Sequence, residues 1–128
     1  MRNIFFLVVA GALGTLSRYG LGGLTQRLSG AGFPYGTLVI NTLGCFAIGL
    51  IMQIALSTDL MSPAVRIAAT IGFLGAFTTF STFSYETVRF LEDGAWISAV
   101  LNIGSNVGIG LLATFSGMLL GRAIMGGI

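Results

Sequence analysis

Apolar side chains run along this chain in four long stretches, which short polar segments separate. The stretches cover about residues 3–24, 34–57, 63–91 and 95–122. A helix needs about 20 predominantly apolar residues to cross the hydrocarbon core of a bilayer, and each stretch is long enough. The pattern predicts an all-α membrane protein with four transmembrane helices, and we expect residues 1–128 to form a single domain.

Local signals mark where these helices begin and end. Pro34 opens the second helix, and Ser62-Pro63 opens the third with an N-cap followed by proline at the first helical position. Residues 92–94 close the third helix, and Trp96 lies where an interfacial anchor is expected. The first stretch is similar to a signal peptide, but its apolar run continues past the plausible cleavage region. We expect it to be retained as the first helix.

Composition narrows the class of protein further. Charged residues make up 8% of the chain and hydrophobic residues 55%, whereas a soluble domain carries about 25% charge. The net charge is only +2 and the arginines are dispersed, so nucleic-acid binding is not expected. The chain has no histidine, one cysteine (Cys45) inside an apolar run, and no convergent acid pair. We therefore expect no enzyme.

The arginines are divided equally between the two ends of the helices. Because four spans place both termini on one side, three arginines fall near each membrane face: Arg2, Arg66 and Arg122 against Arg18, Arg27 and Arg89. Orientation follows the Lys/Arg excess in short loops, and here neither side has one. This even distribution of arginines favours copies that insert in both orientations and pair as an antiparallel, dual-topology homodimer. The alternative is a single orientation set by arginines of unequal weight.

Small residues indicate where helices approach one another. The pairs Gly104/Gly108 and Gly117/Gly121 have the four-residue spacing that allows close backbone contact between helices. This contact is expected either within one subunit or between two.

The third stretch has an unusual centre. Residues 72–87 read GFLGAFTTFSTFSYET, with two glycines and seven hydroxyl side chains at membrane depth. Gly72, Gly75 and the pair Thr78-Thr79 all lower helix propensity. We expect a break at 75–79, near the bilayer centre, whose freed carbonyls suit a small cation. The alternative is an unbroken helix that uses glycine for close packing.

Beyond the expected break, Phe80 and Phe83 are three residues apart and share a helix face, which Thr87 continues. An aromatic ring has a positive edge, so two such edges can line a route for an anion without trapping it. Ser81 and Thr82 add hydroxyl donors on adjoining faces. The alternative is that the two rings only fill the core.

Isolated polar residues offer further candidates. An unpartnered amide is costly in hydrocarbon, so Asn41 either bonds to a neighbouring helix or donates to a passing anion. In the fourth stretch, Asn102, Ser105 and Asn106 share a face and form either a hydrogen-bonding track or polar contacts between helices. The second interpretation is favoured for Asn102 and Ser105.

Charged residues within the helices are few. Arg18 either extends to the interface or draws anions into a vestibule. Glu86 lies toward one end of the third helix, and no acid occupies the midplane. Because proton-coupled carriers ordinarily keep an ionisable group inside the membrane, passive conduction fits this chain better.

These residues resemble a known family, the Fluc/CrcB fluoride channels of bacterial membranes. The resemblance covers essentially the whole chain and rests on Arg18, on GTLVINTLG at 36–44, on GFLGAFTTFSTFSYE at 72–86 and on a Gly-rich fourth span. It implies a dual-topology homodimer with two antiparallel pores that exports cytoplasmic fluoride passively. The expected location is the inner or plasma membrane, as a multi-pass protein in the lipid bilayer.

The resemblance also implies roles for individual residues. A structural sodium ion is expected at the dimer centre, held by backbone carbonyls of Gly75 and Thr78. The fluoride path is expected to involve an amide, an aromatic pair, a polar track and a vestibule carboxylate: Asn41, Phe80 and Phe83, Ser81 and Thr82, Glu86 and, in the fourth span, Thr114. Gly110 stands where a hydroxyl is expected, so the fourth-span track departs from the family pattern.

Two other classes of function remain as alternatives. A small multidrug exporter also has four spans, but it relies on an acidic residue in its first span, and this chain has none there. A non-conducting membrane assembly subunit would tolerate the loss of Phe80 or Phe83 as a packing defect.

Overall fold

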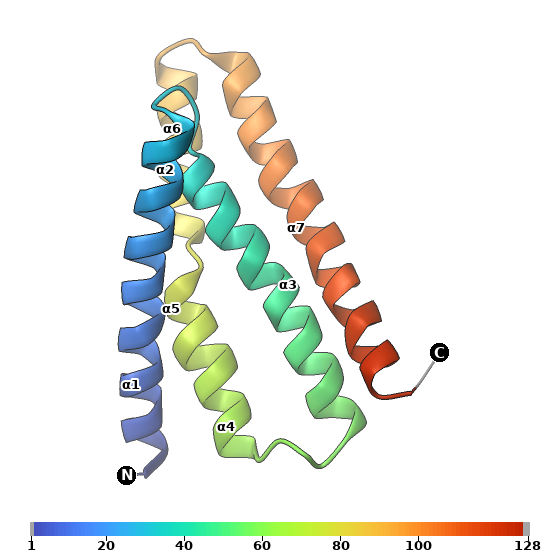
Figure 1. Ribbon diagram of the computed structural model, residues 1–128. Helices are drawn as coiled ribbons and strands as arrows, with labels where there is room; N and C mark the ends of the chain where they lie inside the picture. Colours follow the sequence, from blue (N-terminus) through green and yellow to red (C-terminus); the bar gives the residue numbers. More distant parts are fainter. Residues whose placement is uncertain (1, 127–128) are drawn as a thin grey trace.

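The computed structural model describes residues 2–126, which contain helices and loops and no strand. Four helical spans are long and apolar enough to cross a membrane: Asn3–Ser29, Tyr35–Ser57, Pro63–Glu92 and Trp96–Ile124. This confirms the predicted all-helical class and the four spans. Both ends of the chain and the loop between the second and third spans lie at one end of the molecule, and the other two loops lie at the opposite end (Figure 1).

The first span is longer than the sequence predicted. It consists of α1 (Arg2–Ser17), a π-helical segment η1 (Arg18–Gly22) and α2 (Gly23–Ser29), so it ends five residues beyond residue 24. Its last turn is polar, and apolarity alone does not mark where such a helix ends. Gly30, with a φ of 91°, provides the stop. Gln26 then holds the following loop, because its Oε1 accepts from Gly36 N at 3.1 Å and its Nε2 donates to Phe33 O at 2.9 Å.

The second and fourth spans are the helices α3 (Tyr35–Ser57) and α7 (Trp96–Ile124), which form the most extensive helix pair. Glycines bring their backbones together. A Cβ at Gly49 would overlap the Thr114 carbonyl oxygen, and one at Gly117 would overlap the Phe46 carbonyl oxygen. The predicted close approach at Gly117/Gly121 is therefore made with α3, inside one chain.

Gly104 and Gly108 differ from the other predicted pair. A Cβ at either position would meet no atom within 4 Å in the part of the chain that the structure describes. This face of α7 is open.

The third span is assembled from four pieces: α4 (Pro63–Ile67), the π-helical segment η2 (Ala68–Leu74), α5 (Gly75–Phe77) and α6 (Phe80–Glu92). As predicted, Ser62 caps its start, with Oγ accepting from Val65 N at 3.4 Å, and Pro63 is the first helical residue. Gly94, with a φ of 71°, follows its end. The lower half of this span packs along α1 (Figure 1).

Burial in this chain favours small and polar residues over large apolar ones. Asn102 and Ala99 are fully covered, and Thr37 and Thr87 are buried. Most large apolar side chains are exposed on the outside of the four helices. Lipid is as apolar as leucine, so helices in a bilayer associate through close packing and hydrogen bonds. The distribution is that of a multi-pass membrane protein.

Gly117 provides a test of the α3–α7 contact. Replacing Gly117 with alanine forces a methyl group into backbone atoms of α3, and overpacking of this kind costs about 1–3 kcal/mol. We expect Gly117→Ala to lower the midpoint of thermal unfolding in detergent. Gly23→Ala is the matched control, since Gly23 has helical φ and ψ and open space around it. Equal unfolding midpoints for the two variants would contradict this account of the packing.

Candidate functional site

The candidate site is centred on two residues of the third span with extended backbone. α5 ends at Phe77, and Thr78 (φ −87°, ψ 161°) and Thr79 (φ −150°, ψ 108°) follow before α6 begins at Phe80. Thr79 is the N-cap of α6, because its Oγ1 accepts from Thr82 N at 3.2 Å. Extended residues leave helical hydrogen bonds unmade, and those polar groups need other partners.

The carbonyls of Gly75 and Thr78 are among those that lose their helical donors at this point. In a continuous helix, Thr79 N would donate to Gly75 O and Thr82 N to Thr78 O. Here Thr79 N donates to Asn41 Oδ1 at 2.8 Å, and Thr82 N donates to the Thr79 hydroxyl. The carbonyls of Gly75 and Thr78 are thereby released from the helical pattern. Thr78 O accepts instead from Arg18 Nη1 at 3.3 Å, and Gly75 is exposed.

Asn41, on α3, supports the extended backbone. Its Oδ1 accepts from Thr79 N, and its Nδ2 donates to Thr79 O at 3.1 Å and to Asn106 Oδ1 at 3.2 Å. One side chain thus binds both backbone polar groups of Thr79 and one residue of α7. The sequence left two roles open for this amide, bonding to a neighbouring helix or donating to a passing anion. The structure shows the first of these.

The polar network continues along α7. Asn106 Nδ2 donates to the backbone oxygen and to Oδ1 of Asn102, both at 3.0 Å. Asn102 Nδ2 donates to Thr87 Oγ1 at 3.0 Å, and Thr87 Oγ1 donates to Phe83 O at 2.8 Å. Asn102 therefore links α7 to α6. Among residues 2–126, Ser105 bonds to carbonyls of its own helix alone. Within this part of the chain the expectation that Ser105 joins two helices is therefore wrong.

Phe80 and Phe83 lie together at the start of α6. Their ring centroids are 5.5 Å apart with an interplanar angle of 56°. Phe83 is 9% exposed, whereas Phe80 is 78% exposed. Both line a largely apolar cavity of about 380 Å³, together with Gly75, Thr78, Asn41 and Asn106.

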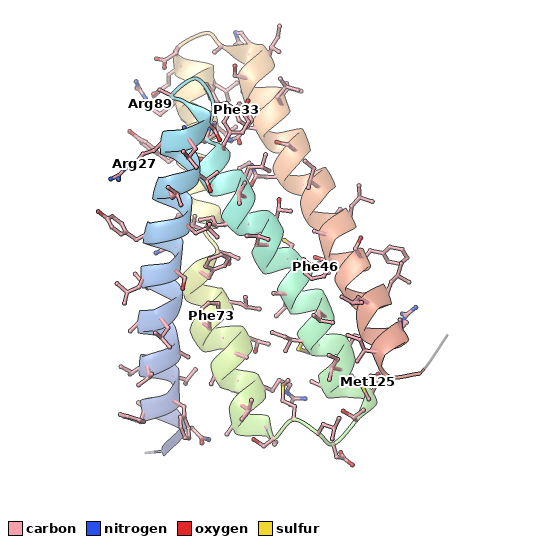
Figure 2. The ribbon with its side chains drawn as sticks, viewed as in Figure 1. Arg27, Phe33, Phe46, Phe73, Arg89 and Met125 are labelled. Carbon is pink, nitrogen blue, oxygen red and sulfur yellow. The ribbon has the colours of Figure 1, made fainter. Side chains whose placement is uncertain are left out.

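A second cavity, of about 490 Å³, shares Thr79 with the first. Arg18 and Arg27 line it, and its remaining polar side chains are hydroxyls with no carboxylate among them: Thr15, Tyr19, Thr37, Thr79 and Thr82. Arg27 projects from the upper end of the molecule, as does Arg89 (Figure 2). Arg89 is paired with Glu92 at 3.0 Å and Asp93 at 3.5 Å. The cavity therefore combines positive charge with hydroxyl groups, a lining suited to an anion.

Glu86 stands beside this second cavity and lines a third, of about 320 Å³, with Arg89 and Asp93. Its Oε1 accepts from Thr37 Oγ1 at 2.7 Å. Its Oε2 is buried and has no hydrogen-bond partner among the residues that the structure describes.

The predicted site residues thus divide into groups. Gly75, Thr78, Asn41, Phe80 and Phe83 come together at the first cavity, and Arg18 and Thr82 at the second. Ser81 is exposed on α6, with Oγ 3.4 Å from Thr79 Oγ1.

Thr114 lies apart from these groups. Its Oγ1 donates to Gly110 O of its own helix at 3.0 Å, and it lines none of the three cavities.

Several residues at these cavities were not among the predicted site residues, and they include Arg27, Thr37, Thr79 and Asn106. Thr79 had a signal, because it belongs to the same hydroxyl-rich stretch as its neighbours. Asn106 was noted as a polar residue of the fourth span, but its bond to Asn41 joins residues 65 positions apart. No local pattern encodes such a contact.

Comparison with known proteins places these features in a family. Residues 5–118 match the family model described as CrcB-like protein, Camphor Resistance (CrcB). Among similar proteins, one from Geobacter sulfurreducens is 50% identical over 124 residues, covering 97% of this chain and 100% of its own. One from Dehalococcoides mccartyi (strain ATCC BAA-2100) is also 50% identical over 124 residues, covering 97% of this chain and 95% of its own.

A third protein, from Citrifermentans bemidjiense, is 46% identical over 124 residues, which cover 97% of this chain and all of the relative. All three relatives are named fluoride-specific ion channel FluC. The family model and these relatives match nearly the whole length of the chain, and the matched residues 5–118 span both cavities. The chain therefore belongs to the CrcB-like family, whose similar members are named as ion channels.

Proposed function

We propose that this protein is a fluoride-selective channel that passively exports cytoplasmic fluoride across the inner or plasma membrane. The observation that carries the proposal is the 50% identity, over nearly the whole chain, to proteins named fluoride-specific ion channel. The site adds a physical basis, because an arginine-lined cavity and an aromatic cavity share Thr79 in their linings. Thr78 and Thr79 lie near the middle of the 30-residue third span, so we expect them near the bilayer midplane.

In this proposal, fluoride enters from the second cavity. Arg18 and Arg27 raise the local concentration of anions there, and the hydroxyls of Thr37 and Thr82 replace part of the ion's water shell. Glu86, held by Thr37, forms one wall of the entrance. Conduction requires sites strong enough to admit an ion and weak enough to release it, and hydroxyl donors meet that requirement better than a direct ion pair.

The ion then passes the aromatic pair. The edges of Phe80 and Phe83 carry partial positive charge and attract an anion weakly. Asn41 supplies an amide donor at the same cavity, and Ser81 extends the row of hydroxyls. Thr114 belongs to the path only through a second copy of the chain, because in one copy it lies apart.

A structural sodium ion is proposed at the carbonyls of Gly75 and Thr78. Unwound backbone carbonyls are the usual sodium ligands of discontinuous membrane helices, and these two have lost their helical donors. In a single chain Thr78 O accepts from the guanidinium of Arg18, and in this proposal the sodium ion takes the place of that cationic donor. When bound, the ion would supply fixed positive charge at the extended backbone.

An antiparallel homodimer completes both sites. Two carbonyls are too few to enclose a cation, and a second copy would double them. Phe80 is largely exposed in a single chain, which suits a wall shared with a partner. The open face at Gly104 and Gly108 leaves room for another helix. The even distribution of arginines favours opposite orientations for the two copies, so each dimer would contain two pores.

Anion flux from liposomes tests the function. Purified protein in liposomes should release fluoride, followed with a fluoride electrode, while chloride efflux from matched liposomes stays near the protein-free rate. Comparable rates for both anions would rule out the proposed selectivity. No efflux of either anion would favour a non-conducting membrane subunit.

The aromatic pair gives a second prediction. Phe80→Ile and Phe83→Ile keep the volume apolar but remove the positive ring edges, so each should reduce fluoride efflux strongly while the folded dimer is retained on gel filtration. Phe5→Ile, on the exposed surface of α1, is the matched control and should conduct normally. Unchanged efflux in both pore variants would count against an aromatic path.

The sodium proposal gives a third. Replacing sodium by a large organic cation such as N-methyl-D-glucamine, which the carbonyls cannot enclose, should reduce efflux or weaken the dimer. Potassium chloride and sodium chloride at equal ionic strength separate a specific cation effect from screening. If neither fluoride efflux nor the stability of the dimer changes when sodium is replaced, there is no reason to place an ion at Gly75 and Thr78.

A further inference from the structure

We infer that Asn102 is a positioning residue for the extended backbone of the third span. It lies on α7, has no hydrogen bond to Thr79 among the residues that the structure describes, and acts on it through two other amides. The members of this relay are linked by hydrogen bonds in the order Thr87, Asn102, Asn106, Asn41 and Thr79. The inference concerns how the chain holds this backbone and goes beyond the question of which ion crosses.

The relay begins with a side chain that cannot move freely. Asn102 is 0% exposed. Its Nδ2 donates to Thr87 Oγ1 at 3.0 Å, which leaves Oδ1 directed toward Asn106 as an acceptor. Because Thr87 Oγ1 is also bonded to Phe83 O, the donor end of Asn102 is fixed to α6. Reversing the amide would break the first bond and place a donor against Asn106.

Asn102 in turn determines which way Asn106 faces. Both the backbone oxygen and Oδ1 of Asn102 are acceptors, and Asn106 Nδ2 donates to each at 3.0 Å. The Oδ1 of Asn106 must then point away, where it accepts from Asn41 Nδ2 at 3.2 Å. If Asn106 were reversed, its amide nitrogen would face the nitrogen of Asn41, donor against donor.

The orientation of Asn41 follows in the same way. Its Nδ2 is directed at two acceptors, Asn106 Oδ1 and Thr79 O, so its Oδ1 is left to accept from Thr79 N at 2.8 Å. That last bond takes Thr79 N away from Gly75 O. A buried residue of α7 therefore helps to keep the Gly75 carbonyl free of its helical donor.

Amide hydrogen exchange at Thr79 tests the inference. Asn102→Leu keeps the heavy-atom shape of the side chain and removes both polar ends. We expect Thr79 N–H, observed by NMR in detergent or nanodiscs, to exchange about tenfold faster, which corresponds to the loss of one hydrogen bond. Amides of α1 should keep their rates. Ser116→Ala on the same helix is the control, because Ser116 Oγ donates to Leu112 O and has no other partner in the described part of the chain.

A second variant keeps the test decisive if Asn102→Leu does not fold. Asn106→Leu removes the middle of the relay at a half-buried position, and it should accelerate Thr79 exchange by the same factor. The double variant should exchange no faster than either single one, since residues that act as one unit are not additive.

Three results would overturn the inference. The first is Thr79 exchange at the wild-type rate in whichever variant folds. The second is equal acceleration at Thr79 and in α1, which would mean general loosening. The third is a double variant whose effect is the sum of the single ones. None of these outcomes depends on fluoride flux. If the protein does not conduct fluoride, amide hydrogen exchange at Thr79 still tests this inference.

Discussion

The arrangement around the third span depends on one constraint, the need to satisfy backbone polar groups where no water is available. Residues with extended backbone at membrane depth are tolerated only where protein or a watery cavity supplies partners. Asn41 on α3 binds both backbone groups of Thr79, and Arg18 in the first span donates to Thr78 O. The side-chain hydroxyl of Thr79 in turn accepts from Thr82 N at the start of α6. Each of these partners adjoins one of the two cavities, so satisfying the backbone also fixes the positions of the polar side chains that line them.

Much of the architecture could be predicted from the sequence, because the bilayer imposes a simple length rule. The second, third and fourth spans end within two residues of the ranges that apolar length indicated, and Ser62-Pro63 begins the third as a cap. The end of the first span was missed because its final turn is polar and is ended by a glycine conformation. Hydropathy does not register such a turn.

The cavities were harder to predict because π-helical segments change which residues share a face. At 3.6 residues per turn, Arg18 and Arg27 are nine residues apart and should lie about half a turn away from each other. Yet both line the second cavity. The segment η1 between them has a wider turn and shifts the register of everything that follows. Regular helical periodicity therefore places Arg27 on the face of the first span opposite to Arg18. In the third span, η2 has a comparable effect on the residues that follow it.

The same hydrogen bonds bear on how a small, strongly hydrated anion could pass. Both polar ends of Asn41 are already used within the protein, by Thr79 and Asn106. An anion that approaches Asn41 must therefore compete with acceptors that are already in place, and the amide exchanges one hydrogen bond for another. The anion therefore gains less binding free energy from Asn41 than from a free donor, because the gain is only the difference between the new hydrogen bond and the one it replaces. A path built from such occupied donors holds an ion weakly, which is the condition for rapid release.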